Sequence, residues 1–211
     1  MDKRRLLYGL VVCGGNSKRM GIDKCMLDYH GLPQWQYIFN NVKDLCDAIL
    51  ISCNLQQLNL LPSSLAVITD DERYSGKGPM AALLSAAAKY PDVDFLLIGC
   101  DYPLLTPIDI KQLVVSYYNK EQTTAGWNKV EEVYDPLIAI YTAESIVAAQ
   151  ELFAEGNHSL QFVLREVNAF KVELSSVNMK SVDTPQQYLA VKQLLRDAAL
   201  KNDQISEGTV F

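Results

Sequence analysis

The stretch that decides the fold is LLYGLVVCGGNSKRMGIDK, residues 6–24. Leu6 to Cys13 form a continuous apolar run, and a run that is apolar on both faces is typical of a buried strand in a parallel sheet. Gly14 and Gly15 follow this run and free the backbone to approach a ligand closely. The stretch therefore predicts a buried first strand that ends in a binding loop.

Strand and helix patterns alternate from this loop onward. In the first part of the chain, strands are expected at 6–13, 48–53, 64–69 and 94–100, and helices at 33–46, 79–90 and 108–118. The second part is less regular, with strands expected at 123–127, 133–141 and 170–174 and helices at 143–155, 160–167 and 184–200. Connections too long for hairpins indicate right-handed crossovers between parallel strands. We expect an α/β fold with a mostly parallel sheet, which binds its ligand beyond the carboxyl ends of the strands.

The charge and hydrophobicity of the chain exclude several classes of protein. The 211 residues include 19 Lys and Arg against 25 Asp and Glu, a net charge of −6, which argues against nucleic-acid binding through bulk positive charge. The apolar runs are shorter than the ~20 residues of a membrane-spanning helix. The basic start MDKRR leads into glycine and charge without the small-residue cleavage pattern of a secretory signal. We expect a cytoplasmic protein with neither nucleic acid nor membrane as its partner.

The cysteines show no pattern of a metal site or a disulfide framework. There are five, an odd number, and no two form a CxxC pair. Three of them end apolar runs that are expected to be strands, so the cysteines are interpreted as small buried hydrophobic residues. The five are Cys13, Cys25, Cys46, Cys53 and Cys100.

The loop after the first strand has the chemical character of a phosphate site. Lys18, Arg19 and Lys24 bring three cations within seven residues, next to glycine amides that can form a nest for an anion. The loop lacks the spacing of a Walker A motif and of a dinucleotide-binding GxGxxG. The alternative is that the glycines only turn the chain while the cations lie in solvent.

The residues of this loop resemble a known family. GGNSKRMGIDK resembles the (L)AGGxSxRMGxDK signature of the nucleotidyltransferases that attach a nucleotide to molybdopterin, particularly the molybdenum cofactor guanylyltransferases. GKGPMAALLSA after Asp71, FLLIGCDYPLL and VDTPQQY resemble further segments of that family in the same order. The resemblance covers residues 8–190, most of the chain.

The resemblance implies a Rossmann-like nucleotidyltransferase fold, a three-layer sandwich with a mostly parallel sheet. Residues 1–200 would form one domain, with a nucleotide-binding half at 1–120 and an acceptor-binding half at 121–200, followed by a polar tail at 201–211. The implied reaction transfers GMP from GTP to the terminal phosphate of molybdopterin, releases pyrophosphate and uses Mg²⁺. Other proteins of cofactor biosynthesis or molybdoenzyme maturation would be its protein partners.

The resemblance also assigns residues to this reaction. The implied nucleotide contacts are Val12, Cys13, Gly14, Gly15, Ser52, Asp71 and Gly78. Arg19 and Lys24 would hold the phosphates and Asp101 the magnesium ion, as the three catalytic residues. A carboxylate at a strand end is the hard oxygen ligand that magnesium prefers. Two alternatives stay open: Asp101 caps the helix that starts near Thr106, and Asp70 takes the role of Asp71.

On the acceptor side, the candidates are Asp135, His158, Ser159 and Asp183. The sequence departs from the family here, because Asp135 precedes Pro136 where the family often has His-Pro, and Asp183 stands where the family often has Asn. Asp183 is alternatively a second magnesium ligand, and Ser159 alternatively a helix cap. A further departure is Ala82, where the family has Gly.

The choice of nucleotide rests on one loop. Cytidylyl relatives tend to carry Ala-Ala-Gly where this chain has Cys13-Gly14-Gly15, so the glycine pair favours GTP. The alternatives are a cytidylyltransferase, a sugar-phosphate nucleotidylyltransferase of the same fold, and a nucleotide-binding regulator without turnover.

Overall fold

A seven-stranded sheet forms the centre of the molecule in the computed structural model, which describes residues 5–14 and 22–207. Its strand order is β3-β2-β1-β4-β6-β5-β7. The strands are β1 (Leu7–Val12), β2 (Ala48–Ser52), β3 (Val67–Ile68), β4 (Asp94–Gly99), β5 (Thr124–Asn128), β6 (Val133–Tyr141) and β7 (Phe170–Glu173).

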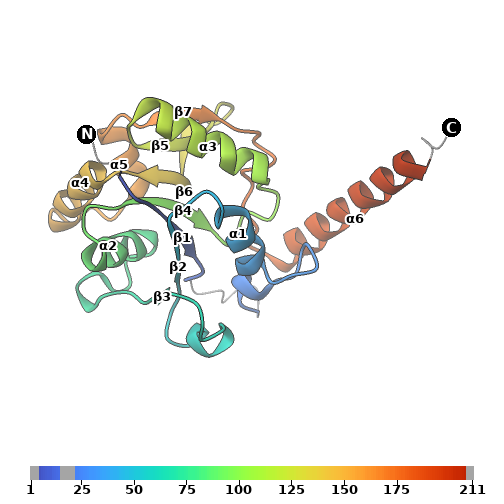
Figure 1. Ribbon diagram of the computed structural model, residues 1–211, viewed down its shortest axis with the longest axis horizontal. Helices are drawn as coiled ribbons and strands as arrows, with labels where there is room; N and C mark the ends of the chain where they lie inside the picture. The colour runs from blue at the N-terminus through green and yellow to red at the C-terminus, as the bar shows by residue number, and fades with distance from the viewer. Residues whose placement is uncertain (1–4, 15–21, 208–211) are drawn as a thin grey trace.

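Helices cover both faces of this sheet (Figure 1). The helices are α1 (Gln34–Val42), α2 (Pro79–Lys89), α3 (Pro107–Lys120), α4 (Ala143–Ala154), α5 (Leu160–Glu166) and α6 (Pro185–Glu207), with short 3-10 turns η1 (Lys24–Met26), η2 (Gln57–Leu60) and η3 (Glu72–Tyr74). α1 and α3 lie on one face, whereas α2, α4 and α5 lie on the other. The three-layer α/β sandwich is therefore confirmed.

The apolar runs of the central strands supply both cores. In β4, Phe95 and Leu97 pack against α2 and α4, while Leu96 and Ile98 point to the α1 and α3 side. All four are at most 1% exposed. Successive side chains of a strand point to opposite faces, so a strand with helices on both sides must be apolar throughout.

The sheet is mostly parallel, with one strand reversed. β1 pairs in parallel with β2 and with β4, β2 with β3, and β5 with β7. β6 runs antiparallel to both β4 and β5. Only residues 129–132 separate β5 and β6, as in a hairpin, which agrees with the less regular pattern of the second part of the sequence. The reversal places the beginning of β6 beside the carboxyl end of β4.

The strand order reverses direction at β1, which has β2 on one side and β4 on the other. Val12 lies opposite Ser52 of β2 and opposite Gly99 of β4. The carboxyl ends of the first and fourth strands therefore lie side by side. Such a switch point is where open α/β sheets bind ligands.

Most expected helices begin and end within a few residues of their observed bounds. α1 ends at Val42, four residues before the expected end at Cys46, and α6 continues to Glu207 where a polar tail was expected from residue 201. The sequence KNDQISE of residues 201–207 contains no Gly or Pro to stop a helix, and Gly208 is the first such residue. α6 projects away from the rest of the molecule (Figure 1). None of the described helices is both long and apolar enough to cross a membrane.

Candidate functional site

Lys24, Asp101 and Asp183 meet at the carboxyl edge of the sheet, although they lie far apart in the sequence. The Lys24 ammonium donates to Asp183 Oδ1 at 2.5 Å and lies 4.0 Å from Asp101 Oδ2. η1 carries Lys24, the turn after β4 carries Asp101, and the segment before α6 carries Asp183. The Val182 amide donates to the Asp101 carbonyl at 2.8 Å, which fixes these last two segments to each other.

The Asp101 carboxylate is held in an unfavourable place for a charge. Its Oδ1 is buried and has no hydrogen-bond partner among the described residues, whereas its side chain as a whole is 24% exposed. Burial raises the pKa of Asp101, the Lys24 charge opposes that rise, and the Asp183 charge adds to it. The alternative role as a cap is wrong, because Thr106 and Asp109 form the capping box of α3. A buried carboxylate oxygen that no donor contacts, such as Asp101 Oδ1, is typical of a group that binds a cation.

The nucleotide contacts expected near β1 lie along the same edge. Val12 and Cys13 are buried, Ser52 is 2% exposed, and Gly14 is exposed. A Cβ atom added at Gly14 would meet no atom within 4 Å, so the space beside it is open. Gly15 and Arg19 lie outside the described residues, and their roles stay predictions.

Asp71 and Gly78 lie in the connection between β3 and α2. The Asp71 carboxylate accepts from Arg73 Nε at 2.9 Å and from Arg73 Nη2 at 2.8 Å, and these bonds lower its pKa to about 2. Gly78 precedes Pro79 at the start of α2 with a φ of 61°, which glycine adopts without the strain of a side chain. Asp70, the alternative to Asp71, is an exposed residue, although partial burial of its carboxyl group raises its pKa. A contact of Asp71 with a base or ribose stays a prediction.

Asp135, a candidate on the acceptor side, lies in β6 next to the Asp101 turn. Its Oδ1 accepts from the Tyr102 hydroxyl at 2.8 Å and from the Leu137 amide at 3.0 Å. Burial raises the pKa of Asp135 to about 6, although both hydrogen bonds act in the opposite direction. The reversed β6 thus brings one acceptor candidate close to the predicted metal ligand.

His158 and Ser159 lie between α4 and α5. The His158 ring packs on Phe153, with centroids 4.8 Å apart, and Phe153 in turn contacts Tyr74 of η3. The Ser159 hydroxyl accepts from the Phe162 amide at 3.2 Å, which confirms the alternative role as the cap of α5. Their roles in acceptor binding stay predictions.

Sequence reasoning missed two residues that shape this site. A Cβ at Gly99 would lie 2.6 Å from Asp101 Oδ1, so a glycine is required for the carboxylate to occupy its place. Gln57 is 1% exposed and bonds to both Cys13 and Asp23. A glycine inside an otherwise bulky strand was a usable signal for close approach, whereas a Gln in the polar stretch NLQQLN gave none.

The cysteines behave mainly as buried apolar residues. Cys13, Cys25, Cys53 and Cys100 are buried and Cys46 is half-buried, all as free thiols. Cys13 Sγ and Cys100 Sγ lie 3.2 Å apart beneath the site. Among the described residues, no group of three or more His, Cys, Asp or Glu side chains is arranged to hold a metal. Magnesium nevertheless fits, because it needs only one or two carboxylates and completes its shell with water and phosphate oxygens.

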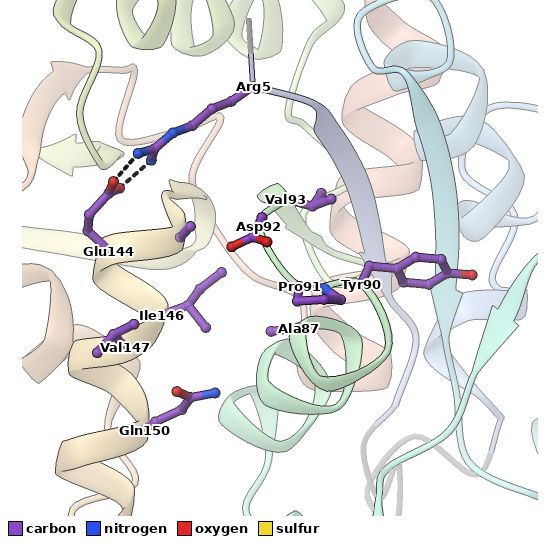
Figure 2. Close-up of a pocket in the computed structure, with 11 residues that line it drawn as sticks. Arg5, Ala87, Tyr90, Pro91, Asp92, Val93, Glu144, Ile146, Val147 and Gln150 are labelled. Atoms are coloured by element: carbon purple, nitrogen blue, oxygen red, sulfur yellow. Dashed lines mark hydrogen bonds and ion pairs between the residues drawn. The ribbon is translucent and has the colours of Figure 1, made fainter. Parts of the chain in front are cut away.

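A cavity of about 380 Å³ lies at the opposite edge of the sheet, between α2, α4 and the start of β4 (Figure 2). Arg5 and Glu144 pair across it through both guanidinium Nη atoms. Its walls include Tyr90, Val93 and Ile146. None of the predicted site residues that the structure describes lines this cavity, which is therefore separate from the described part of the candidate site.

Among the described residues, the site combines the Lys24 cation, the Asp101 and Asp183 carboxylates and an open edge at Gly14. Such a set suits a polyphosphate that brings a divalent ion, because the ammonium neutralises phosphate charge and the carboxylates hold the ion. The chemistry open to such an arrangement is the positioning of a phosphate ligand and the neutralisation of its charge.

Comparison with known proteins places the chain in a family. A family model described as the MobA-like NTP transferase domain matches residues 9–172. A molybdenum cofactor biosynthesis bifunctional protein of Synechocystis sp. is 27% identical over 86% of this chain, which spans about half (52%) of that relative's length. A molybdenum cofactor guanylyltransferase of Yersinia pseudotuberculosis is 28% identical over 80% of this chain and 85% of the relative.

A solved structure shares the fold. The crystal structure of molybdopterin-guanine dinucleotide biosynthesis protein A from Archaeoglobus fulgidus matches with a TM-score of 0.69 at 14% identity. The match covers 90% of this chain and 99% of that one. At this identity the likeness establishes the nucleotidyltransferase-like α/β fold.

Proposed function

Since the chain belongs to the MobA-like NTP transferase domain family and is a nucleotidyltransferase, we propose that it transfers GMP from GTP to the terminal phosphate of molybdopterin and releases pyrophosphate. The convergence of Gly14, Lys24 and Asp101 on one edge of the sheet is the observation that carries the proposal. The names of the guanylyltransferase relatives support the choice of guanine and molybdopterin.

The reaction is an in-line displacement at the α-phosphorus of GTP. An oxygen of the acceptor phosphate forms the new P–O bond, and the bond from the α-phosphorus to the bridging oxygen of the β-phosphate breaks. Pyrophosphate carries away the bonding pair, so the step needs neither a covalent enzyme intermediate nor a redox partner. Lys24 neutralises phosphate charge, and the edge at Gly14 leaves room for the phosphates.

Asp101 is the proposed magnesium ligand, with Asp183 as a second ligand or an acceptor contact. When bound, magnesium would offset charge on the phosphate oxygens of the nucleotide. Lys24, which bonds Asp183 in this structure, would turn from the carboxylates to the phosphates as the nucleotide enters. Asp135 would lie on the acceptor side of Asp101, where Tyr102 fixes its orientation.

Pyrophosphate release from GTP in the presence of molybdopterin and magnesium tests this function. The same assay with CTP and ATP, together with isothermal titration of each nucleotide, tests the base. We expect release with GTP, and release dependent on the acceptor. Tighter binding and faster release with CTP would assign a cytidylyltransferase, and binding without release in every mixture would assign a regulator.

A further inference from the structure

Gln57 connects the two segments that carry the phosphate-binding groups. Its Nε2 donates to the Cys13 carbonyl at 2.9 Å and to Asp23 Oδ2 at 2.6 Å. Cys13 directly precedes Gly14 at the end of β1, and Asp23 directly precedes Lys24. One buried side-chain amide therefore links Cys13, next to Gly14, with Asp23, next to Lys24.

Every hydrogen-bonding group of the Gln57 side chain is used. Its Oε1 accepts from the Asn54 backbone amide at 2.9 Å, while Nε2 donates to its two oxygen acceptors and has a longer contact of 4.0 Å with Cys25 Sγ. A flipped amide would place its oxygen against a carbonyl and a carboxylate, which offer no proton, so this orientation is fixed. The side chain is 1% exposed, and its bonds are therefore protected from competition by water.

The hydrogen bond from Gln57 to Asp23 also affects the position of Lys24, because Asp23 caps the turn that begins at Lys24. Asp23 caps η1, where its Oδ1 accepts from the Cys25 amide at 3.3 Å, and its Oδ2 takes the Gln57 proton. η1 is only three residues long, so its own hydrogen bonds hold it weakly. The orientation of this turn decides where the Lys24 ammonium lies.

We propose that Gln57 is a positioning residue for the nucleotide phosphates: its amide fixes η1, and hence Lys24, relative to Gly14 at the end of β1. This inference rests on the proposed function. Gln57 touches no reacting atom itself, and acts through Cys13 and Asp23. Two donors and one acceptor on a neutral group are found only in Asn and Gln, so a charged side chain at position 57 would not replace it.

Two variants separate this role from a purely structural one. Gln57→Leu removes both donors, and Gln57→Glu keeps the acceptor for Asn54 but sets a second carboxylate against Asp23. We expect the KM for GTP to rise about 10- to 100-fold in each, as displacement of a positioned group by about 1 Å can produce. The KM for molybdopterin and the circular dichroism spectrum should not change.

Two control variants show whether a loss of stability alone raises the KM for GTP. Gln56→Leu changes the exposed neighbour in the same turn and should leave the KM for GTP unchanged. Val93→Ala lies at the opposite edge of the sheet, and should lower Tm while leaving that KM unchanged. If Gln57→Leu and Gln57→Glu lower Tm without raising the KM for GTP, the role is structural only and the proposal is wrong.

An exchange of the bonding partners gives a second test. Asp23→Asn in the Gln57→Glu background restores a donor opposite an acceptor, so the KM for GTP should fall below that of Gln57→Glu alone. An unchanged or higher KM in the double variant would contradict the proposal. Isothermal titration with magnesium and GTP gives the same comparison without turnover, so it still decides on Gln57 if the wild-type protein releases no pyrophosphate and the proposed function fails.

Discussion

At the scale of single residues, Asp101 is a carboxylate that the folded protein holds at a cost in stability. Burial raises its pKa, which means that the folded state disfavours the charged form relative to the unfolded state. Lys24 offsets this only in part, since it lies 4.0 Å away and also bonds Asp183. Residues kept in such a state are typical of functional sites.

We predict that Asp101→Asn lowers turnover without lowering thermal stability. The amide removes a buried charge, so Tm in the absence of ligands should equal or exceed that of the wild type. Turnover should fall about 100- to 1000-fold, as for the loss of one preorganised stabilising group. Thermal unfolding and pyrophosphate release measure the two effects, and near-normal turnover would remove Asp101 from the metal site.

Gly99 leads to a prediction about the space that this carboxylate occupies. In Gly99→Ala the new Cβ would meet Asp101 Oδ1 at 2.6 Å and Tyr102 Cε2 at 3.1 Å, so the carboxylate must move and turnover should fall. Gly9→Ala is the matched control, because its Cβ would meet Ile49 Cδ1 at 2.7 Å, remote from the site. Both variants should lose stability, and equal turnover per folded molecule in the two would contradict the prediction.

The raised pKa of Asp135 predicts that the free energy of unfolding depends on pH. Its pKa is about 6 in the folded protein, above its ordinary value near 3.8. Between these values the folded state binds the proton more tightly, so this contribution to stability is complete below about pH 4 and is lost as pH rises through 6, by up to about 3 kcal/mol. Asp135→Asn keeps both hydrogen bonds to Oδ1 and removes the titration.

The measurement is urea unfolding at several pH values. The free energy of unfolding of Asp135→Asn, relative to wild type, should rise from pH 4 to pH 7. A difference that is independent of pH would show that Asp135 has an ordinary pKa in the folded protein.

At the scale of elements, α3 depends on a cap that also holds the segment before α6. Asp109 Oδ2 accepts from the Thr106 amide at 2.9 Å, from the Thr106 hydroxyl at 2.6 Å and from Asn178 Nδ2 at 2.8 Å. We predict that Asp109→Ala lowers the free energy of unfolding by about 1–3 kcal/mol, since the cap is lost and buried donors are left unpaired. Lys111→Ala, an exposed change on the same helix, should stay within about 0.5 kcal/mol in the same urea titration.

The same elements show how far sequence patterns reach. Continuous apolar runs predicted β1, β2 and β4 to within a residue or two, and the Ala-rich stretch predicted α2, because burial and helix propensity act locally. The reversal of β6 escaped prediction, since strand direction depends on pairing with distant β4. The contacts of Gln57 escaped it for the same reason, because its acceptors lie 34 and 44 residues away in the sequence.

At the scale of the whole molecule, the strand order explains why the candidate residues meet. β1 lies at the switch point between β2 and β4, so the loops after β1 and β4 leave the sheet side by side. The segment before α6 passes the same edge, where the Val182 amide binds the Asp101 carbonyl. The site is therefore assembled from three parts of the chain that only the complete fold brings together.

A site assembled in this way must couple ligand binding to global stability. A ligand that binds only the folded state stabilises it by about 2.7 kcal/mol at a hundred times its Kd. For a protein of this size that corresponds to a Tm increase of roughly 5–10 °C. We predict such an increase with GTP and magnesium, and a clearly smaller one with GTP and excess EDTA, because Asp101 Oδ1 then lacks a cation. In Asp101→Asn the two increases should differ less than they do in the wild type, since the variant lacks the carboxylate proposed as the magnesium ligand. Equal increases with magnesium and with EDTA in the wild type would contradict a metal at this edge of the sheet.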